Sequence, residues 1–127
     1  MLTFRHFTKQ SSTAFLPTCR DLITTDVEFH LALDLVCRSE QLPFRDSSID
    51  ALVLKDALHH IPDVEAFLDE ATRVLKTGGV AVIFDPYWGP LARFVYTYLH
   101  QEAFNPRTPS WSFEASSPWD SNQALSF

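Results

Sequence analysis

The sequence is poor in glycine, in cysteine and in long apolar runs. Its three glycines, Gly78, Gly79 and Gly89, all lie in the second half of the chain. A glycine-rich loop, whose main chain could approach a ligand closely, is therefore excluded from the first half. The two cysteines, Cys19 and Cys37, lack metal-type spacing. We expect free thiols in a reducing compartment, and therefore a cytoplasmic protein.

Charge and hydropathy exclude two further classes of partner. The net charge is -6 and the basic residues form no run, which argues against a nucleic-acid grip on phosphates. No stretch approaches the roughly 20 apolar residues of a membrane span. The hydrophobic content of 46% and eleven phenylalanines predict a folded core, and 127 residues suffice for one domain.

The chain divides into three predicted parts. Residues 1–20 show no sustained periodicity and are predicted to be irregular, whereas residues 21–100 carry alternating strand and helix patterns. Residues 101–127 form a serine- and proline-containing tail with three large aromatics, Trp111, Phe113 and Trp119. We expect this tail to lie against an apolar surface.

Four apolar runs predict strands at residues 22–26, 33–37, 50–55 and 80–84. Only six residues separate the first two runs, so a tight crossover must join them. The last run is apolar on both faces, which predicts that both faces are covered.

The segment after position 62 predicts an amphipathic helix. Asp63 is a suitable N-cap, and Gly78 is suited to a left-handed C-terminal residue. Asp69 and Arg73 lie four residues apart and are expected to pair weakly. The apolar residues recur on one face: Val64, Phe67, Leu68, Ala71, Val74 and Leu75. A second helix is expected to start at Pro90.

A strand, a helix and a buried strand form a right-handed βαβ unit, so the predicted fold is α/β, an open, mostly parallel sheet flanked by helices. Asp26, Asp56 and Asp85 lie at or just after the carboxyl ends of predicted strands. Ligands of such sheets bind beyond these ends, so the three acids are candidate site residues. For Asp85, capping of an Asp-Pro turn is an equally good interpretation.

The motifs "LPF", "LHH", "RVLKTGG" and "FDP" occur in this order between Leu42 and Pro86. As a set they resemble the second half of the class I S-adenosylmethionine-dependent methyltransferases of the small-molecule type (type 11), over roughly residues 22–90. The resemblance implies a Rossmann-like methyltransferase fold, S-adenosylmethionine as cofactor and a small-molecule methyl acceptor. The chain then looks like a truncated C-terminal portion of the family pattern.

The resemblance also implies roles by position. Asp26 would hold the ribose hydroxyls of the cofactor, and Leu42 and Phe44 would lie near its adenine. The segment from Lys55 through Asp56 to His59 would line the methyl donor and the acceptor. Methyl transfer from a sulfonium is an in-line displacement, so the protein mainly aligns the two reactants and excludes water.

The sequence departs from the family pattern in three places. The glycine-rich first motif is absent, and Arg38 stands where the family usually has an acid that accepts from the adenine amino group. After the last predicted strand the chain adds one helix, where the family adds two further strands. These departures are typical of a truncated or diverged member, or of one part of a longer polypeptide.

His59 is the candidate catalytic residue, because imidazole is well suited to remove a proton near neutral pH. The alternative is that His60 leads into the helix and His59 is a polar wall residue. No metal is expected, since the adjacent His59 and His60 rarely converge with acids such as Asp56 and Asp85 on one ion.

Two functions follow from these patterns. The first is methyl transfer to an unidentified small-molecule acceptor, with the aromatic segment after Phe84 hinting at a flat or lipophilic compound. The second is a non-catalytic methyltransferase-like remnant that acts as an interaction module. Such a remnant could form a homo-oligomer through an exposed sheet edge.

Overall fold

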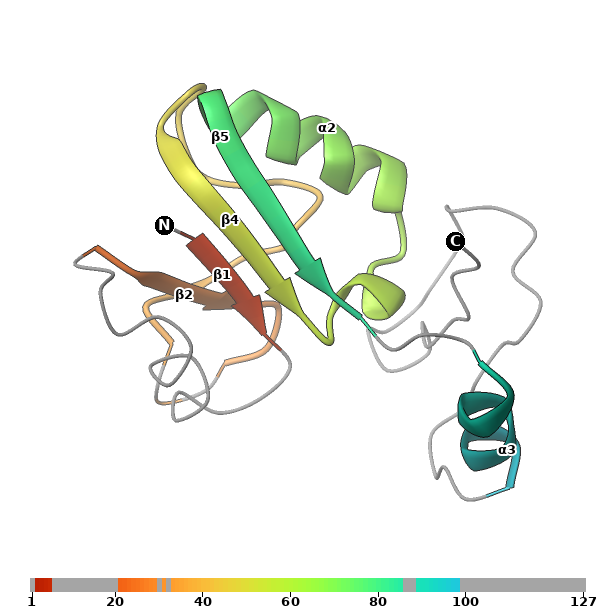
Figure 1. The fold of residues 1–127 in the computed structure, drawn as a ribbon. Helices are drawn as coiled ribbons and strands as arrows, with labels where there is room; N and C mark the ends of the chain where they lie inside the picture. The colour runs from red at the N-terminus through yellow and green to blue at the C-terminus, as the bar shows by residue number, and fades with distance from the viewer. Residues whose placement is uncertain (1, 6–20, 30, 32, 86–88, 99–127) are drawn as a thin grey trace.

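A computed structural model describes residues 2–5, 21–29, 31, 33–85 and 89–98 (Figure 1). A five-stranded sheet has the strand order β3-β2-β1-β4-β5, and every neighbouring pair is parallel. The strands are β1 (Leu2–Arg5), β2 (Ile23–Asp26), β3 (Leu35–Val36), β4 (Ile49–Lys55) and β5 (Leu75–Phe84). The predicted α/β fold with an open parallel sheet is confirmed.

The central strand β1 corrects the prediction that residues 1–20 are irregular. Leu2–Arg5 lies between β2 and β4, with Leu2 paired to Ile23 on one side and to Leu52 on the other. The described part of the sheet therefore has five strands rather than the predicted four. Four residues are too few to show a strand periodicity, so this strand could not be predicted from the sequence pattern. Residues 6–20 lie outside the described part of the chain.

The link between β2 and β3 is tightened by Asp34. Its carboxylate accepts hydrogen bonds from both the main-chain N–H and the hydroxyl of Thr24, at 2.9 and 2.8 Å. The N–H of Asp34 in turn donates to the main-chain oxygen of Thr24 at 3.1 Å. These bonds join two parallel strands over a short connection, as the spacing predicted. Strand β3 is shorter than the predicted strand at residues 33–37 and covers only Leu35–Val36.

Helix α2 (Val64–Val74) lies beside β4 and β5 and supplies much of the core (Figure 1). The predicted N-cap is confirmed, since the carboxylate of Asp63 accepts from the N–H of Ala66 at 3.0 Å. Phe67 is the largest fully buried side chain. The buried hydrophobic residues form one cluster: Leu42, Ile49, Leu52, Leu54, Leu58, Ile61, Val64, Phe67, Ala71 and Val74.

Helix α2 ends at Val74, four residues before the predicted end at Gly78. Leu75 pairs with Ile49 at the start of β4, and this strand pairing competes with a further helical turn. The next pairing joins Ala51 to Val80, so the residues between Leu75 and Val80 form an irregularity in the strand. Gly78 adopts a φ of 81° there. Its conformational freedom is used inside the strand rather than at the helix end.

Strand β5 is the outermost strand in the described part of the sheet (Figure 1). None of its residues is buried. Val80, Val82, Ile83 and Phe84 are 54%, 36%, 38% and 53% exposed. The prediction that both faces of this strand are covered is therefore wrong for the described residues. Helix α3 (Pro90–Tyr98) starts at Pro90 as predicted.

Several predicted features lie outside the described residues, namely Cys19, the tail of residues 101–127 and its aromatic side chains.

The short helix η1 (Leu58–His60) follows β4 and precedes α2. Within the described ranges, no helix has the length and apolar character needed to cross a membrane.

Candidate functional site

The carboxyl ends of β2, β1, β4 and β5 lie along one edge of the sheet. The register places Arg5 opposite Lys55, and Lys55 opposite Phe84. Asp26 ends β2, and Asp85 is the residue after β5. Because all these strands are parallel, the predicted acids occupy the same edge, where ligands of open α/β sheets bind. We call this edge the carboxyl rim.

Asp26 is a buried carboxylate at the rim, with only 6% of the residue exposed. One oxygen accepts the N–H of Glu28 at 3.1 Å, which turns the chain as it leaves β2. A carboxylate offers about four acceptor positions in all. The ribose-binding role that the family resemblance implies for Asp26 stays a prediction.

Lys55 and Asp56 lie at the end of β4. The ammonium of Lys55 forms an ion pair with the carboxylate of Asp56. Asp56 has a φ of 49°, in the left-handed region, and its N–H donates to the main-chain oxygen of Phe84 at 2.8 Å. Such a conformation is costly for a residue other than glycine and is found preferentially at functional positions. Asp56 is therefore held at the rim in a fixed, strained conformation.

His59 and Asp85 form a buried pair that the sequence analysis did not identify. Nδ1 of His59 lies 2.9 and 3.0 Å from the two oxygens of Asp85, and the side chains are 10% and 7% exposed. A carboxylate only accepts, so the proton of this contact resides on Nδ1. The signal that could have found the pair is the position of both residues shortly after predicted strands. Both residues follow strand ends that meet at one edge.

The other interpretation of Asp85, capping of an Asp-Pro turn, stays untested. Its carboxylate contacts His59, 26 residues away. The residues described after Asp85 resume at position 89, so the turn itself lies outside the structure's described ranges.

Cys37 follows β3 near the rim as a free, half-buried thiol. Burial raises the pKa of this thiol, a hydrogen bond with Thr25 opposes the rise, and the charge of Asp26 adds to it. A raised pKa keeps the thiol protonated at neutral pH, so Cys37 is a poor nucleophile. Among the described residues, no group of three or more histidines, cysteines and acids is arranged to hold a metal ion.

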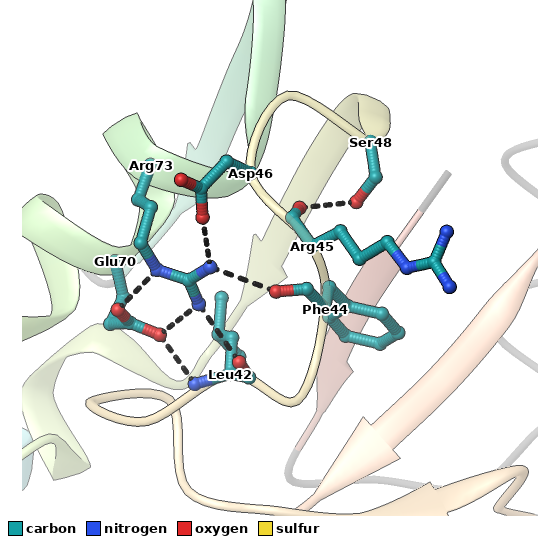
Figure 2. Close-up of polar contacts among 7 residues, drawn as sticks. All are labelled: Leu42, Phe44, Arg45, Asp46, Ser48, Glu70 and Arg73. Carbon is teal, nitrogen blue, oxygen red and sulfur yellow. Dashed lines mark hydrogen bonds and ion pairs between the residues drawn. The ribbon is translucent and has the colours of Figure 1, made fainter.

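The "LPF" segment lies against helix α2 rather than free at the rim (Figure 2). Leu42 is 3% exposed and belongs to the core, and the half-buried Phe44 packs against that core. The main chain of Leu42 is bonded to Glu70 and Arg73, so these two residues position the segment. The sequence analysis missed Glu70, and it paired Arg73 with Asp69. In the structure Arg73 forms ion pairs with Glu70, three residues earlier, and with Asp46.

Arg38 follows β3 and forms an ion pair with Glu40 at 2.9 Å. The hydroxyl of Ser39 also donates to Glu40, at 3.0 Å. The N–H of Gln41 donates to the main-chain oxygen of Arg38, which closes a turn. The segment that leaves β3 at the rim is thus tightly folded before it reaches Leu42.

Comparison with known protein families shows which family the chain belongs to. A family model described as a methyltransferase domain matches residues 8–83, which is more than half of the chain. The chain belongs to the class I S-adenosylmethionine-dependent methyltransferases. A solved structure with a similar fold is that of the YcgJ protein from Bacillus subtilis. That structure has a TM-score of 0.61 and 25% sequence identity, and the alignment covers 76% of this chain and 49% of that one.

Two curated methyltransferases are similar to this one in sequence. A demethylmenaquinone methyltransferase from Streptomyces avermitilis is 38% identical over 69 residues, covering 52% of this chain and 29% of the relative. A ubiquinone/menaquinone biosynthesis C-methyltransferase from Stenotrophomonas maltophilia is 43% identical over 56 residues, covering 43% of this chain and 22% of the relative. The match thus spans less than a third of either relative's length.

Proposed function

We propose that this methyltransferase chain binds S-adenosylmethionine at the carboxyl rim and takes part in methyl transfer to a small-molecule acceptor. The observation that carries the proposal is the placement of Asp26, Asp56 and the His59–Asp85 pair at one edge of a parallel sheet. We also propose that the protein is located in the cytoplasm.

The residues of the rim fit the polar parts of such a cofactor. The Asp26 carboxylate can accept hydrogen bonds from two ribose hydroxyls, as acids at this position do in dinucleotide-binding sheets. Phe44 offers an aromatic ring for the adenine, whereas the Leu42 side chain serves the core. The carboxylates of Asp56 and Asp85 favour a cationic group nearby. The region where a glycine-rich loop would approach the cofactor falls among residues 6–20, outside the described ranges.

When bound, S-adenosylmethionine supplies an electrophilic methyl group on a sulfonium. The residues of the chain would align the acceptor and keep water out. His59 is proposed to take the proton that the acceptor gives up, at Nε2, while Asp85 holds Nδ1. Among the described residues Nε2 has no hydrogen-bond partner.

We propose a flat, lipophilic acceptor that loses a proton on methylation, such as a hydroquinone. The support comes from the names of the two relatives, one a demethylmenaquinone and the other a ubiquinone/menaquinone biosynthesis methyltransferase. A group that accepts a proton at the rim suits an acceptor with an acidic hydroxyl.

Calorimetric titration with S-adenosylmethionine and with its demethylated product, S-adenosylhomocysteine, tests cofactor binding. Incubation with methyl-labelled S-adenosylmethionine and demethylmenaquinol then tests transfer. Saturable binding with label in the quinol supports the whole proposal. Binding without transfer limits the proposal to the cofactor site, and no binding by either ligand rejects it.

A second candidate function is that of an interaction module without catalysis. The observation that favours it is the exposed outer strand β5, whose apolar side chains Val80, Val82, Ile83 and Phe84 are uncovered among the described residues. An uncovered strand edge pairs readily with another chain, so a homo-oligomer would form there. Size-exclusion chromatography with light scattering separates the two functions, since a monomer that binds S-adenosylhomocysteine excludes the second.

A further inference from the structure

Arg73 of helix α2 uses all of its hydrogen-bonding capacity on one loop and one neighbour. Its guanidinium has five N–H donors, and five bonds are present (Figure 2). Two go to Glu70, both at 2.7 Å. The others go to the main-chain oxygens of Phe44 and Leu42, at 2.8 and 2.9 Å, and to the carboxylate of Asp46, at 2.7 Å.

Glu70 completes the arrangement from the other side. Its carboxylate accepts the N–H of Leu42 at 2.7 Å, so the two main-chain polar groups of Leu42 are both bonded to the Glu70–Arg73 pair. Among the described residues, neither main-chain group of Leu42 is hydrogen-bonded to another main-chain group. A buried main-chain group without a partner costs free energy, so the pair takes the place of secondary structure here.

The charges of the pair reinforce each other. Hydrogen bonds from Arg73 lower the pKa of the Glu70 carboxyl, with burial opposing and the Leu42 N–H assisting. Glu70 first, and then Asp46, raise the pKa of the Arg73 guanidinium. Both side chains are therefore charged at neutral pH, and charge-assisted hydrogen bonds are stronger than neutral ones.

The loop connects this pair to the carboxyl rim. Residues 38–41 leave the end of β3 as a closed turn, and Leu42 follows directly. The segment that leaves the rim after β3 is therefore fixed at Leu42 by two residues of α2, Glu70 and Arg73. The side chain of Leu42, buried in the core, adds a third point of attachment.

We infer that Glu70 and Arg73 are positioning residues that set the path of the loop after β3, and through it the affinity of the rim for the adenosyl cofactor. The cofactor half of this inference rests on the proposed function. The loop half stands on the contacts alone. Neither residue touches the ligand under this inference.

Arg73→Lys is the sharpest variant, because lysine keeps the charge but offers three donors instead of five. Glu70→Gln is the second variant, since it keeps the shape and removes the charge. The matched control is Lys76→Met, which removes another ion pair of the same kind, Lys76 with Asp50 at 2.6 Å, that makes no contact with the loop. Circular dichroism identifies any variant that fails to fold.

Two readouts decide the inference in the 127-residue chain. Hydrogen exchange of a peptide covering residues 38–46 should quicken roughly tenfold in both variants, while peptides of β4 stay protected. The dissociation constant for S-adenosylhomocysteine should rise by roughly tenfold as well, with Lys76→Met unchanged in both measurements.

Unchanged exchange in Arg73→Lys and Glu70→Gln would overturn the inference. Faster exchange with unchanged affinity would overturn the positioning role and leave a purely structural one. If the wild-type chain does not bind S-adenosylhomocysteine, the proposed function and the cofactor half both fail. The exchange measurement then still tests whether Glu70 and Arg73 set the path of the loop.

Discussion

His59 and Asp85 lie 26 residues apart in the sequence and meet at the carboxyl rim, with 2.9 Å between Nδ1 and Oδ1. One follows β4 and the other follows β5, so the parallel sheet brings them together. The carboxylate fixes the tautomer of the ring, with the proton on Nδ1 and the acceptor position on Nε2.

We predict that Asp85→Asn abolishes this tautomer preference. An amide can donate as well as accept, so it no longer requires the proton on Nδ1. Nitrogen-15 NMR of labelled histidine reads the tautomer directly, and His60→Gln serves as control and as an assignment aid. A wild-type spectrum with the proton of neutral His59 on Nε2 would contradict the geometry.

The N-cap of α2 gives a prediction on stability. Replacing Asp63 by alanine removes the acceptor for the Ala66 N–H and the favourable charge at the helix start. The free energy of unfolding should fall by about 1 kcal/mol. Urea denaturation measures it, and Asp69→Ala, on the exposed side of the same helix, should change it by less than about 0.5 kcal/mol. Equal effects of both substitutions would argue against the cap.

The Glu70–Arg73 pair predicts a specific acid sensitivity. The pKa of Glu70 is lower in the folded chain than its ordinary value, chiefly because Arg73 donates to it. The stabilisation is therefore present above the ordinary glutamate range, about 4.3, and is lost as the pH falls through the lower folded pKa. Denaturation curves at about pH 6 and about pH 3 should differ less in Glu70→Gln than in wild type. Glu65→Gln is the matched control.

If Glu70→Gln and wild type lose stability in parallel over this range, the carboxylate of Glu70 does not contribute in the way described. A parallel loss in Glu65→Gln and wild type is expected, because Glu65 is exposed in the first turn of α2.

The left-handed conformation of Asp56 predicts different effects of two substitutions on stability. Asp56→Gly relieves a backbone cost of about 1 kcal/mol and should leave the free energy of unfolding unchanged or higher. Asp56→Val should lower it by at least about 1 kcal/mol, since a β-branched residue tolerates this region poorly. Chemical denaturation compares the two. A destabilised glycine variant would show that the carboxylate, not the backbone, matters most for folding.

Helix α2 shows how far the sequence alone could predict the fold. Its cap at Asp63 is a local feature and is confirmed, and so is its apolar stripe, apart from the exposed Leu68 and from Leu75, which lies in β5. The predicted helix end at Gly78 was wrong because Leu75 pairs with Ile49, a contact between residues distant in the sequence. The predicted pairing of Arg73 with Asp69 was wrong for a similar reason. Spacing permits Asp69 or Glu70, and the loop oxygens on the side of Glu70 decide between them.

The site was predictable in its location and less so in its contacts. Acids at strand ends follow from the periodicity of the strands, so Asp26, Asp56 and Asp85 could be placed at one edge. The strand β1 and the contact of His59 with Asp85 depend on the assembled sheet. No spacing in the sequence encodes either. The roles of Asp26, Leu42, Phe44, Lys55, Asp56 and His59 toward a ligand stay predictions.

The central claim is that a buried acid at the end of β2 holds the cofactor, and one titration tests it most directly. S-adenosylhomocysteine is titrated into wild type, Asp26→Ala and Asp21→Ala, the last altering an exposed acid just before the other end of the same strand. We predict saturable binding by wild type and Asp21→Ala, and a dissociation constant at least about tenfold higher for Asp26→Ala. Equal affinity in all three chains, or no heat of binding in wild type, would contradict the account.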